Sequence, residues 1–371
     1  MRDKIRGSLF GGAVGDALGY PVEFLRSKEI FRRYGEKGIC DYRLQDGQAL
    51  ISDDTQMSLF TACGILYGDT RARMRGMGVP LSTYIYEAYL DWLSTQRGVR
   101  PEEKVSWLCN VPALYSLRAP GNTCLEALGS GQMGTIKKPV INSKGCGGIM
   151  RVAPVALYFK NTETKDRISY VDKLGAAAAA ITHGHPLGWL PSAALVHVIC
   201  RLVYGGCTYG EGLRDILQEC EDTLLDLYGD GEDMRKLFHL IALAEKLAEN
   251  DRPDVENIEK IGGGWVAEET LAIALYCCLR YPDDFDKALI ASVNHGGDSD
   301  STGAVAGNIM GAVCGYDRIA EKWKAELELK DVILEIADDL ADGCRMWEFS
   351  DYTDEKWEHK YIHCDYTPER E

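Results

Sequence analysis

The stretch Asn294–Gly311, NHGGDSDSTGAVAGNIMG, combines two glycines, three polar oxygen donors and a run of small residues. Its first half predicts a loop and its second half predicts a helix. Asp298 and Asp300 lie two residues apart, with Ser301 next in the chain. Carboxylate and hydroxyl oxygens are therefore expected to converge at the start of the helix, where they suit a hard cation such as Mg²⁺, Mn²⁺ or Ca²⁺.

A second interpretation of these residues needs no metal. Asp and Ser side chains at the start of a helix accept hydrogen bonds from its free backbone amides, so Asp298, Asp300 and Ser301 could serve only as caps. The segment DSDSTG also begins like a calcium-binding loop of the EF-hand type. Ile309 stands at the twelfth position, where such a loop needs a bidentate Glu, so the EF-hand pattern fails.

Glycines recur every four residues in two segments far apart in the chain: Gly7, Gly11, Gly15 and Gly19, and Gly303, Gly307, Gly311 and Gly315. This spacing puts each set on one helix face, where another backbone can approach closely. Our hypothesis is that the two faces pack together and bring Asp16, Pro21 and Glu23 near Asp298 and Asp300. The alternative is that each face meets some other helix.

A second acidic helix start is predicted at Ser52, Asp53 and Asp54, within ALISDDTQMSLFTACGIL. A short extended piece precedes it, and apolar residues at roughly helical spacing follow. Capping is again the simpler explanation, because the helix dipole favours acidic residues in a first turn. The DDxxD metal motif of prenyl-transfer enzymes fails here, because Met57 stands where its last Asp would be.

The segment KGCGGIMRVAP places Gly145, Gly147 and Gly148 before apolar residues suited to a helix. Backbone amides at such a helix entrance can bind an anion without a basic side chain. A glycine turn that joins two helices explains the pattern equally well without a ligand. His183 and His185 end an alanine-rich helix, where they could bind a metal or serve as caps and solvent contacts.

Composition narrows the class of protein. The chain has 371 residues, 46% of them hydrophobic, and a net charge of −16. So acidic a chain is not expected to bind nucleic acid independently of sequence, or anionic membranes. Its thirteen cysteines include no C-x-x-C pair, which indicates reduced thiols and a cytoplasmic protein. The N-terminal apolar run is too short and too polar for a membrane span.

Almost no segment reads as a strand, so the sequence predicts an all-α fold. We expect one helical domain over residues 1–347 and a C-terminal extension over residues 348–371, with a monomer as the default. Arg71, Arg73 and Arg75 alternate in a predicted glycine-containing loop. The chain beyond this loop, up to about Leu128, is expected to be helical.

Six segments resemble the ADP-ribosylglycohydrolase family, which includes dinitrogenase reductase-activating glycohydrolases and mammalian ADP-ribosylhydrolases. In chain order they are GGAVGDALGYPVEF, SDDTQM, SKGCGGIMRVAP, THGHP, GGGWVAEE and HGGDSDSTGAVAG. The resemblance implies a single compact orthogonal helical bundle that removes ADP-ribose from modified proteins or small molecules. It also implies a centre of two divalent cations, Mg²⁺ or Mn²⁺.

The resemblance also assigns site residues. The implied metal ligands are Ser52, Asp53, Asp54, Asp298, Asp300 and Ser301, and both serines stand where many members have Thr. The implied ADP-ribose contacts are Gly145, Cys146, Gly147, Gly148, Ile149, Met150, Arg151 and His183, with Cys146 in place of a frequent Asn. Glu23 matches an acidic residue near the scissile bond of some members. Five carboxylates crowded at helix starts would stay ionised only with cations among them.

We expect Glu23 to act as acid or base and Asp54 or Asp300 to orient the attacking water, because carboxylates manage protons in other glycoside hydrolyses. The expected partner is an ADP-ribosylated protein or small-molecule conjugate, whose leaving group is read by loops such as Arg71–Leu81. Two alternatives stay open: a non-catalytic protein like the lens crystallins of this family, and phosphoryl-ester hydrolysis. The intact set of acidic residues favours an enzyme over the non-catalytic protein, and release of ADP-ribose rather than phosphate would separate the two hydrolases.

Overall fold

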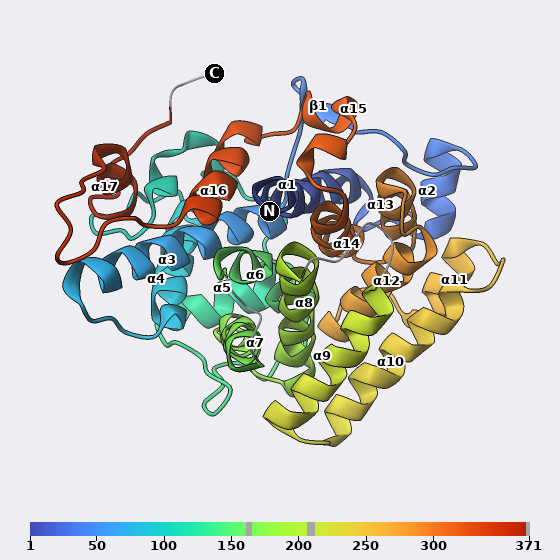
Figure 1. Cartoon of the computed structure of the whole chain (residues 1–371). Helices are drawn as coiled ribbons and strands as arrows, with labels where there is room; N and C mark the ends of the chain where they lie inside the picture. Colours follow the sequence, from blue (N-terminus) through green and yellow to red (C-terminus); the bar gives the residue numbers. More distant parts are fainter. Residues whose placement is uncertain (161–164, 206–211, 369–371) are drawn as a thin grey trace.

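The computed structural model describes residues 1–160, 165–205 and 212–368, and helices make up most of it (Figure 1). The first helices are α1 (Arg2–Gly19), α2 (Ser27–Tyr34), α3 (Asp53–Arg75), α4 (Leu81–Gln96), α5 (Asn122–Gly129), α6 (Ala153–Tyr158), α7 (Lys165–Ala180) and α8 (Pro186–Tyr204). The remaining ones are α9 (Leu213–Tyr228), α10 (Glu232–Ala248), α11 (Asp254–Ile261), α12 (Ala267–Arg280), α13 (Phe285–Val293), α14 (Ser299–Cys314), α15 (Glu321–Lys324), α16 (Lys330–Asp342) and α17 (Glu355–Tyr361). The strands within these ranges are β1 (Leu44–Gln45) and β2 (Gln48–Ala49), an antiparallel pair. The all-α expectation is confirmed.

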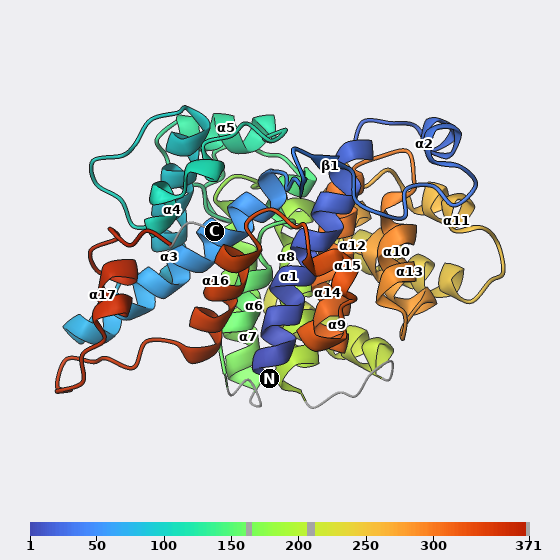
Figure 2. The ribbon, with the colours of Figure 1, turned by 90° about the horizontal axis from the view of Figure 1, so that it is seen from above.

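Helices α1 and α14 lie side by side at the centre of the molecule (Figure 1 and Figure 2). A Cβ atom added to Gly11 would lie 2.4 Å from the carbonyl oxygen of Gly307. One added to Gly303 would lie 2.4 Å from the carbonyl oxygen of Gly15. Only glycine fits between backbones this close. The hypothesis that the two glycine faces pack together is therefore confirmed, and the helices run antiparallel.

This contact brings the C-terminal end of α1 to the N-terminal end of α14. A Cβ atom added to Gly19 would lie 2.3 Å from the carbonyl oxygen of Ser299, so the C-terminal end of α1 touches the N-terminal end of α14. A short 3₁₀ turn, η1 (Tyr20–Val22), then carries the chain to Glu23. Both Asp16 and Glu23 are thereby brought to the acidic start of α14.

The other helices surround this pair. Helices α3 and α4 pack together, as do α7 and α8, while α12 and α13 cover α14 (Figure 1). Helix α8 is long and apolar enough to cross a membrane, but 89% of its most apolar window is buried inside the protein. It therefore has the surroundings of a core helix. One continuous hydrophobic core joins residues from α1 to α17.

The expected loop at Arg71, Arg73 and Arg75 is wrong, because α3 continues through all three arginines. The helix ends at Gly76, whose φ of 63° is the left-handed conformation that glycine adopts readily. Arg73 pairs with Asp69 one helical turn earlier, which stabilises this exposed end. Alternating charges on a solvated helix end gave the sequence the appearance of a loop.

The expected helix up to about Leu128 is correct only in part. Helices α4 and α5 lie in this region, but residues 97–121 contain only two 3₁₀ turns, Trp107–Asn110 and Pro112–Leu114. Prolines punctuate this segment, and each removes a backbone donor that a continuous helix needs. The segment instead passes over the N-terminal end of α3, where Asp53 N–H donates to Arg118 O at 3.0 Å.

The C-terminal extension folds back over α3 and α16. Trp357 is buried, and its indole N–H donates to Thr70 Oγ1 at 2.9 Å. Lys360 and Tyr361 both donate to Asp339 Oδ2 at 2.6 Å. Buried apolar residues of the extension belong to the same core as α1. These contacts tie the extension to the helical domain.

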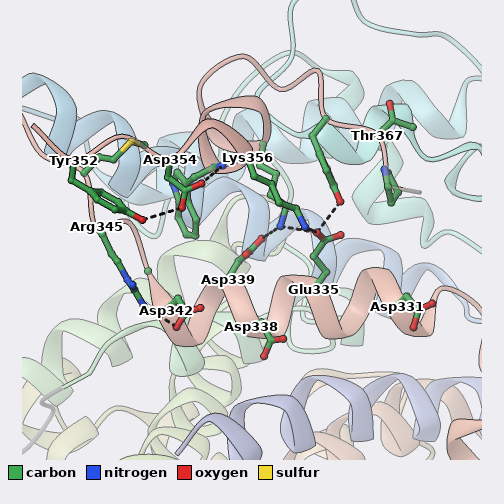
Figure 3. Close-up of a pocket in the computed structure, with 16 residues that line it drawn as sticks. Asp331, Glu335, Asp338, Asp339, Asp342, Arg345, Tyr352, Asp354, Lys356 and Thr367 are labelled. Atoms are coloured by element: carbon green, nitrogen blue, oxygen red, sulfur yellow. Dashed lines mark hydrogen bonds and ion pairs between the residues drawn. The ribbon is translucent and has the colours of Figure 1, made fainter. Parts of the chain in front are cut away.

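A cavity of about 950 Å³ lies between α16 and the C-terminal extension (Figure 3). Acidic side chains line it, but basic ones compensate them. Glu335 pairs with Lys356 and Lys360, and Asp339 pairs with Lys360. Salt bridges across this cavity therefore connect the extension to α16.

The close contact of α1 and α14 predicts that Gly307→Ala destabilises the protein. A Cβ atom there would lie 2.0 Å from the carbonyl oxygen of Gly11, so the helices must separate. We expect the free energy of unfolding to fall by about 3 kcal/mol, measured by urea denaturation.

Gly231→Ala is the matched control. Gly231 has an ordinary φ of −82°, and no atom lies within 4 Å of a Cβ added there. We expect a change below about 1 kcal/mol for this variant. Equal stability of the two variants would contradict the backbone contact.

Candidate active site

The acidic start of α14 is built by capping. Asp298 Oδ1 accepts a hydrogen bond from Ser301 N at 3.2 Å, and Asp300 Oδ1 accepts one from the same N–H at 3.0 Å. The N–H of Asp298 donates to Gly263 O at 2.8 Å, which fixes the turn before the helix. The predicted capping by Asp298 and Asp300 is therefore confirmed, and it uses one oxygen of each carboxylate.

The start of α3 is built in the same way. Ser52 is the N-cap, because its Oγ accepts from Asp54 N at 3.2 Å. Asp53 Oδ2 accepts from Gly121 N at 3.1 Å. Asp54 is 2% exposed, and its Oδ2 has no hydrogen-bond partner among the described residues.

Asp16 fixes the start of α3, a role that sequence reasoning missed. Its carboxylate accepts from Ser52 N at 3.0 and 3.1 Å and from Thr55 N at 3.1 Å, and it also accepts from the Thr55 hydroxyl. Asp16 is fully buried on α1, so it holds the start of α3 against that helix. Its signal in the sequence is a single carboxylate inside a helix of small and apolar residues.

One cavity of about 340 Å³ collects most of the predicted site residues. Those that line it are Glu23, Asp53, Asp54, Gly145, Cys146, Gly147, Met150, His183, Asp298, Asp300 and Ser301. Two segments nearly 250 residues apart in sequence thus share one space. The described lining contains five carboxylates and no Lys or Arg.

Burial dominates the electrostatics of these carboxylates. It raises the pKa of Glu23 to about 9, and the charges of Asp298 and Asp53 add to the rise. Burial also raises the pKa of Asp53 to about 8. For Asp54 and Asp300, burial and neighbouring carboxylates hold the pKa well above its ordinary range. No basic side chain in the described lining compensates the negative charge of these carboxylates.

The donor set fits a hard divalent cation. One carboxylate oxygen each from Glu23, Asp298 and Asp300 can be chosen so that all three lie within 4.8 Å of one another. Glu23 Oε2 and Asp54 Oδ2 are buried and lack a hydrogen-bond partner in the described part of the chain. Unpartnered buried carboxylate oxygens are costly, and oxygen-only donor sets suit Mg²⁺ and Mn²⁺.

The glycine turn lies against His183 on another side of the cavity. The 3₁₀ turn η4 (Cys146–Gly148) follows Gly145, and a Cβ atom added to Gly147 would lie 3.1 Å from His183 Cε1. Burial lowers the pKa of His183 to about 3, with a further contribution from the charge of Arg151. His183 is therefore neutral. His185, by contrast, caps α8 by accepting from Leu187 N at 3.1 Å.

Four predicted site residues do not line the cavity: Ser52, Gly148, Ile149 and Arg151. Arg151 lies one layer behind it, where its guanidinium packs over Tyr89 at 4.3 Å. It donates to Thr182 Oγ1 at 2.6 Å, and that hydroxyl lies 2.8 Å from His183 Nδ1. Arg151 is thus placed to orient His183 rather than to touch a ligand. Ser52 is occupied with capping.

The segment Arg71–Leu81, expected to read the leaving group, does not reach the cavity. Arg71 lies at the far end of α3 from Asp53, about 27 Å along the helix axis at 1.5 Å per residue. No residue of this segment lines the cavity in the described structure. Phe24 and Trp265 line it instead, and sequence reasoning missed both.

Comparison with known proteins agrees with these motifs. The chain is 28% identical over 336 residues to the ADP-ribosyl-[dinitrogen reductase] glycohydrolase of Rhodospirillum rubrum, covering 89% of this chain and 92% of that protein. It is 29% identical over 203 residues to the ADP-ribosylhydrolase ARH3 of Mus musculus, covering 50% and 53%. A solved ADP-ribosylglycohydrolase-related protein complex is 24% identical, covers 92% of this chain and 98% of its own, and shares the fold with a TM-score of 0.57.

The match to a family model settles the classification. The ADP-ribosylglycohydrolase model matches residues 1–349, which include every carboxylate of the cavity and leave most of the C-terminal extension outside. The chain belongs to the ADP-ribosylglycohydrolase family.

Proposed function

We propose that this protein hydrolyses the glycosidic bond between ADP-ribose and a modified protein side chain or small-molecule acceptor. Its family indicates ADP-ribosyl glycohydrolase activity, and the linkage and the two-cation centre are our proposal. The observation that carries it is the cavity with five buried carboxylates and no basic residue in its described lining. Such a site suits a reaction that builds positive charge on a sugar ring.

We propose that Asp53, Asp54, Asp298, Asp300 and Ser301 hold two Mg²⁺ or Mn²⁺ ions, with Ser52 ordering the start of α3. When bound, such cations supply positive charge that keeps the carboxylates ionised and polarises ligand oxygens. The unpartnered Asp54 Oδ2 supports this assignment.

Glu23 is our candidate for the acid and base. Its Oε2 is buried without a partner in the described structure, so it is free to reach a bound ligand. Burial and the charges of Asp298 and Asp53 raise the pKa of Glu23 to about 9 in the cation-free protein. A carboxyl group that carries a proton can protonate a leaving group. The same carboxylate can then accept a proton from the attacking water. Asp54 or Asp300 would orient that water.

The glycine turn and His183 are our candidates for holding the pyrophosphate. The N–H groups of Gly145 and Cys146 already donate to Ser143 Oγ and Trp265 O, so amide contacts to an anion would come from Gly147 and Gly148. Thr182 Oγ1 accepts from Arg151, so its own proton can go to His183 Nδ1. Neutral His183 would then carry its proton on Nε2, which lies near Gly145 and Gly147. In this way an acidic protein binds an anionic ligand.

We also propose that the protein works in the cytoplasm as a monomer. The cysteines of the described chain are free thiols, as in a reducing compartment. Release of intact ADP-ribose would distinguish the proposed reaction from phosphoryl-ester hydrolysis, which would release phosphate. A non-catalytic, crystallin-like protein would release neither product.

Asp300→Asn removes one charge and keeps the size of the side chain. We expect ADP-ribose release from a conjugate to fall by about 100-fold or more, measured by chromatography of the product. Asp91→Asn is the matched control. Asp91 is also a buried carboxyl group, and burial raises its pKa to about 7, but it lies outside the cavity. The Asp91→Asn variant should therefore retain turnover. Wild-type turnover in Asp300→Asn would remove this carboxylate from the mechanism.

Glu23→Gln keeps the shape of the side chain and removes its proton transfer. We expect kcat to fall by about 100-fold to 10,000-fold while the affinity for free ADP-ribose changes little, because the product needs no proton. Steady-state kinetics and calorimetry measure the two quantities. An unchanged kcat would exclude Glu23 as the acid and base.

The raised pKa values predict a pH-dependent stabilisation by cations. Because burial raises the pKa of Asp53 to about 8, the cation-free fold holds more protons than the unfolded chain and loses stability as pH rises from the ordinary carboxyl range to about 8. Divalent cations replace these protons, so the rise in melting temperature with Mg²⁺ or Mn²⁺ should grow between about pH 6 and about pH 9. An equal rise at both pH values would contradict this linkage.

A further inference from the structure

Two exposed aromatic side chains, Phe24 and Trp265, stack at the rim of the cavity. Their ring centroids lie 5.9 Å apart, with an angle of 25° between the ring planes. Phe24 is 71% exposed and Trp265 is 45% exposed, and both line the cavity. Burial in the core therefore does not account for their position. Stacking covers part of each ring, and the exposed part of each side chain can contact a ligand.

The loop that carries Trp265 is rigidly built. Glu269 Oε2 accepts from the N–H groups of Gly263 and Gly264 at 2.9 and 3.1 Å. Trp265 O accepts from Cys146 N at 3.2 Å. These hydrogen bonds fix the backbone of Trp265, and its indole ring stacks on Phe24. A preorganised exposed ring can bind a ligand with little loss of conformational entropy.

Phe24 is placed by its neighbour in the chain. Glu23 is 8% exposed and Phe24 is 71% exposed, so the carboxyl group turns into the cavity while the next ring stays outside. Glu23 and Phe24 are neighbours in the chain and both line the cavity, so a group bonded to a ribose carbon beside Glu23 would lie close to Phe24. The two rings therefore stand beside the expected position of the acceptor.

We propose that Phe24 and Trp265 form an acceptor clamp that binds a planar, nitrogen-linked acceptor group during hydrolysis. This inference rests on the proposed function. Aromatic faces attract flat and cationic groups, and a guanidinium is both. The five carboxylates behind the clamp add attraction for positive charge. A serine-type acceptor offers no flat surface to stack, so the clamp selects planar acceptors against aliphatic ones.

The test compares two substrates, an ADP-ribosylated arginine peptide and an ADP-ribosylated serine peptide. Trp265→Ala should raise KM for the arginine conjugate about fivefold to tenfold and change kcat less. Its KM for the serine conjugate and its calorimetric affinity for free ADP-ribose should stay as in the wild type. Trp265→Phe should restore most of the KM for the arginine conjugate, because the flat face returns.

Trp347→Ala is the matched control. Trp347 is 52% exposed and packs edge-on against Phe349, at ring centroids 5.6 Å apart, but it does not line the cavity. This variant should keep the KM values of the wild type. Equal KM changes in both tryptophan variants would overturn the clamp.

Two further outcomes would overturn the clamp. A weaker affinity of Trp265→Ala for free ADP-ribose would assign the rings to ADP-ribose itself. Equal changes of KM for both conjugates would remove the selection of planar acceptors. Failure of the proposed function looks different, because the wild type would then release ADP-ribose from neither conjugate.

Discussion

The backbone contact between α1 and α14 is the constraint on which the site depends. Each glycine inside a helix costs about 1 kcal/mol relative to alanine, so two glycine-striped helices are poor helices on their own. Their contact offsets that cost, because only glycines allow the carbonyl oxygen of one helix to touch the other. The contact also joins the C-terminal end of α1 to the N-terminal end of α14. Glu23 and Asp16 reach the site only through this junction.

The carboxylates of the cavity destabilise the fold, whereas the glycine contact stabilises it. Five carboxylates are buried together, and burial raises the pKa of each one. A fold selected for stability alone would pair such groups with basic residues, as it does between α16 and the C-terminal extension. The contrast between the compensated cavity and the uncompensated one supports our proposal that cations bind in the uncompensated cavity. Asp16 holds the arrangement by fixing α3 against α1.

Local patterns in the sequence predicted much of this structure. The four-residue glycine spacing identified the contact of α1 with α14, and the paired aspartates marked both helix starts. The predictions that failed concern features that depend on tertiary packing. Arg151 follows Met150, which lines the cavity, yet its long side chain turns back to Thr182 and Tyr89. No spacing rule shows which way a side chain turns.

The stacking of Phe24 on Trp265 was equally invisible, because the two residues are 241 positions apart and each looks like an ordinary core aromatic. The helix through Arg71, Arg73 and Arg75 was missed for the opposite reason. Its charges face solvent, so no apolar period marks it. Sequence reasoning thus identified most of the carboxylates and glycines that line the cavity, but not the aromatic residues beside them.

The central claim is that both acidic helix starts hold divalent cations in one shared cavity. Anomalous X-ray diffraction from crystals grown with Mn²⁺ tests it most directly. We predict two anomalous peaks inside the cavity, between the pair Asp53 and Asp54 and the pair Asp298 and Asp300. Crystals saturated with Mn²⁺ that show no peak there, or peaks only elsewhere, would contradict the account.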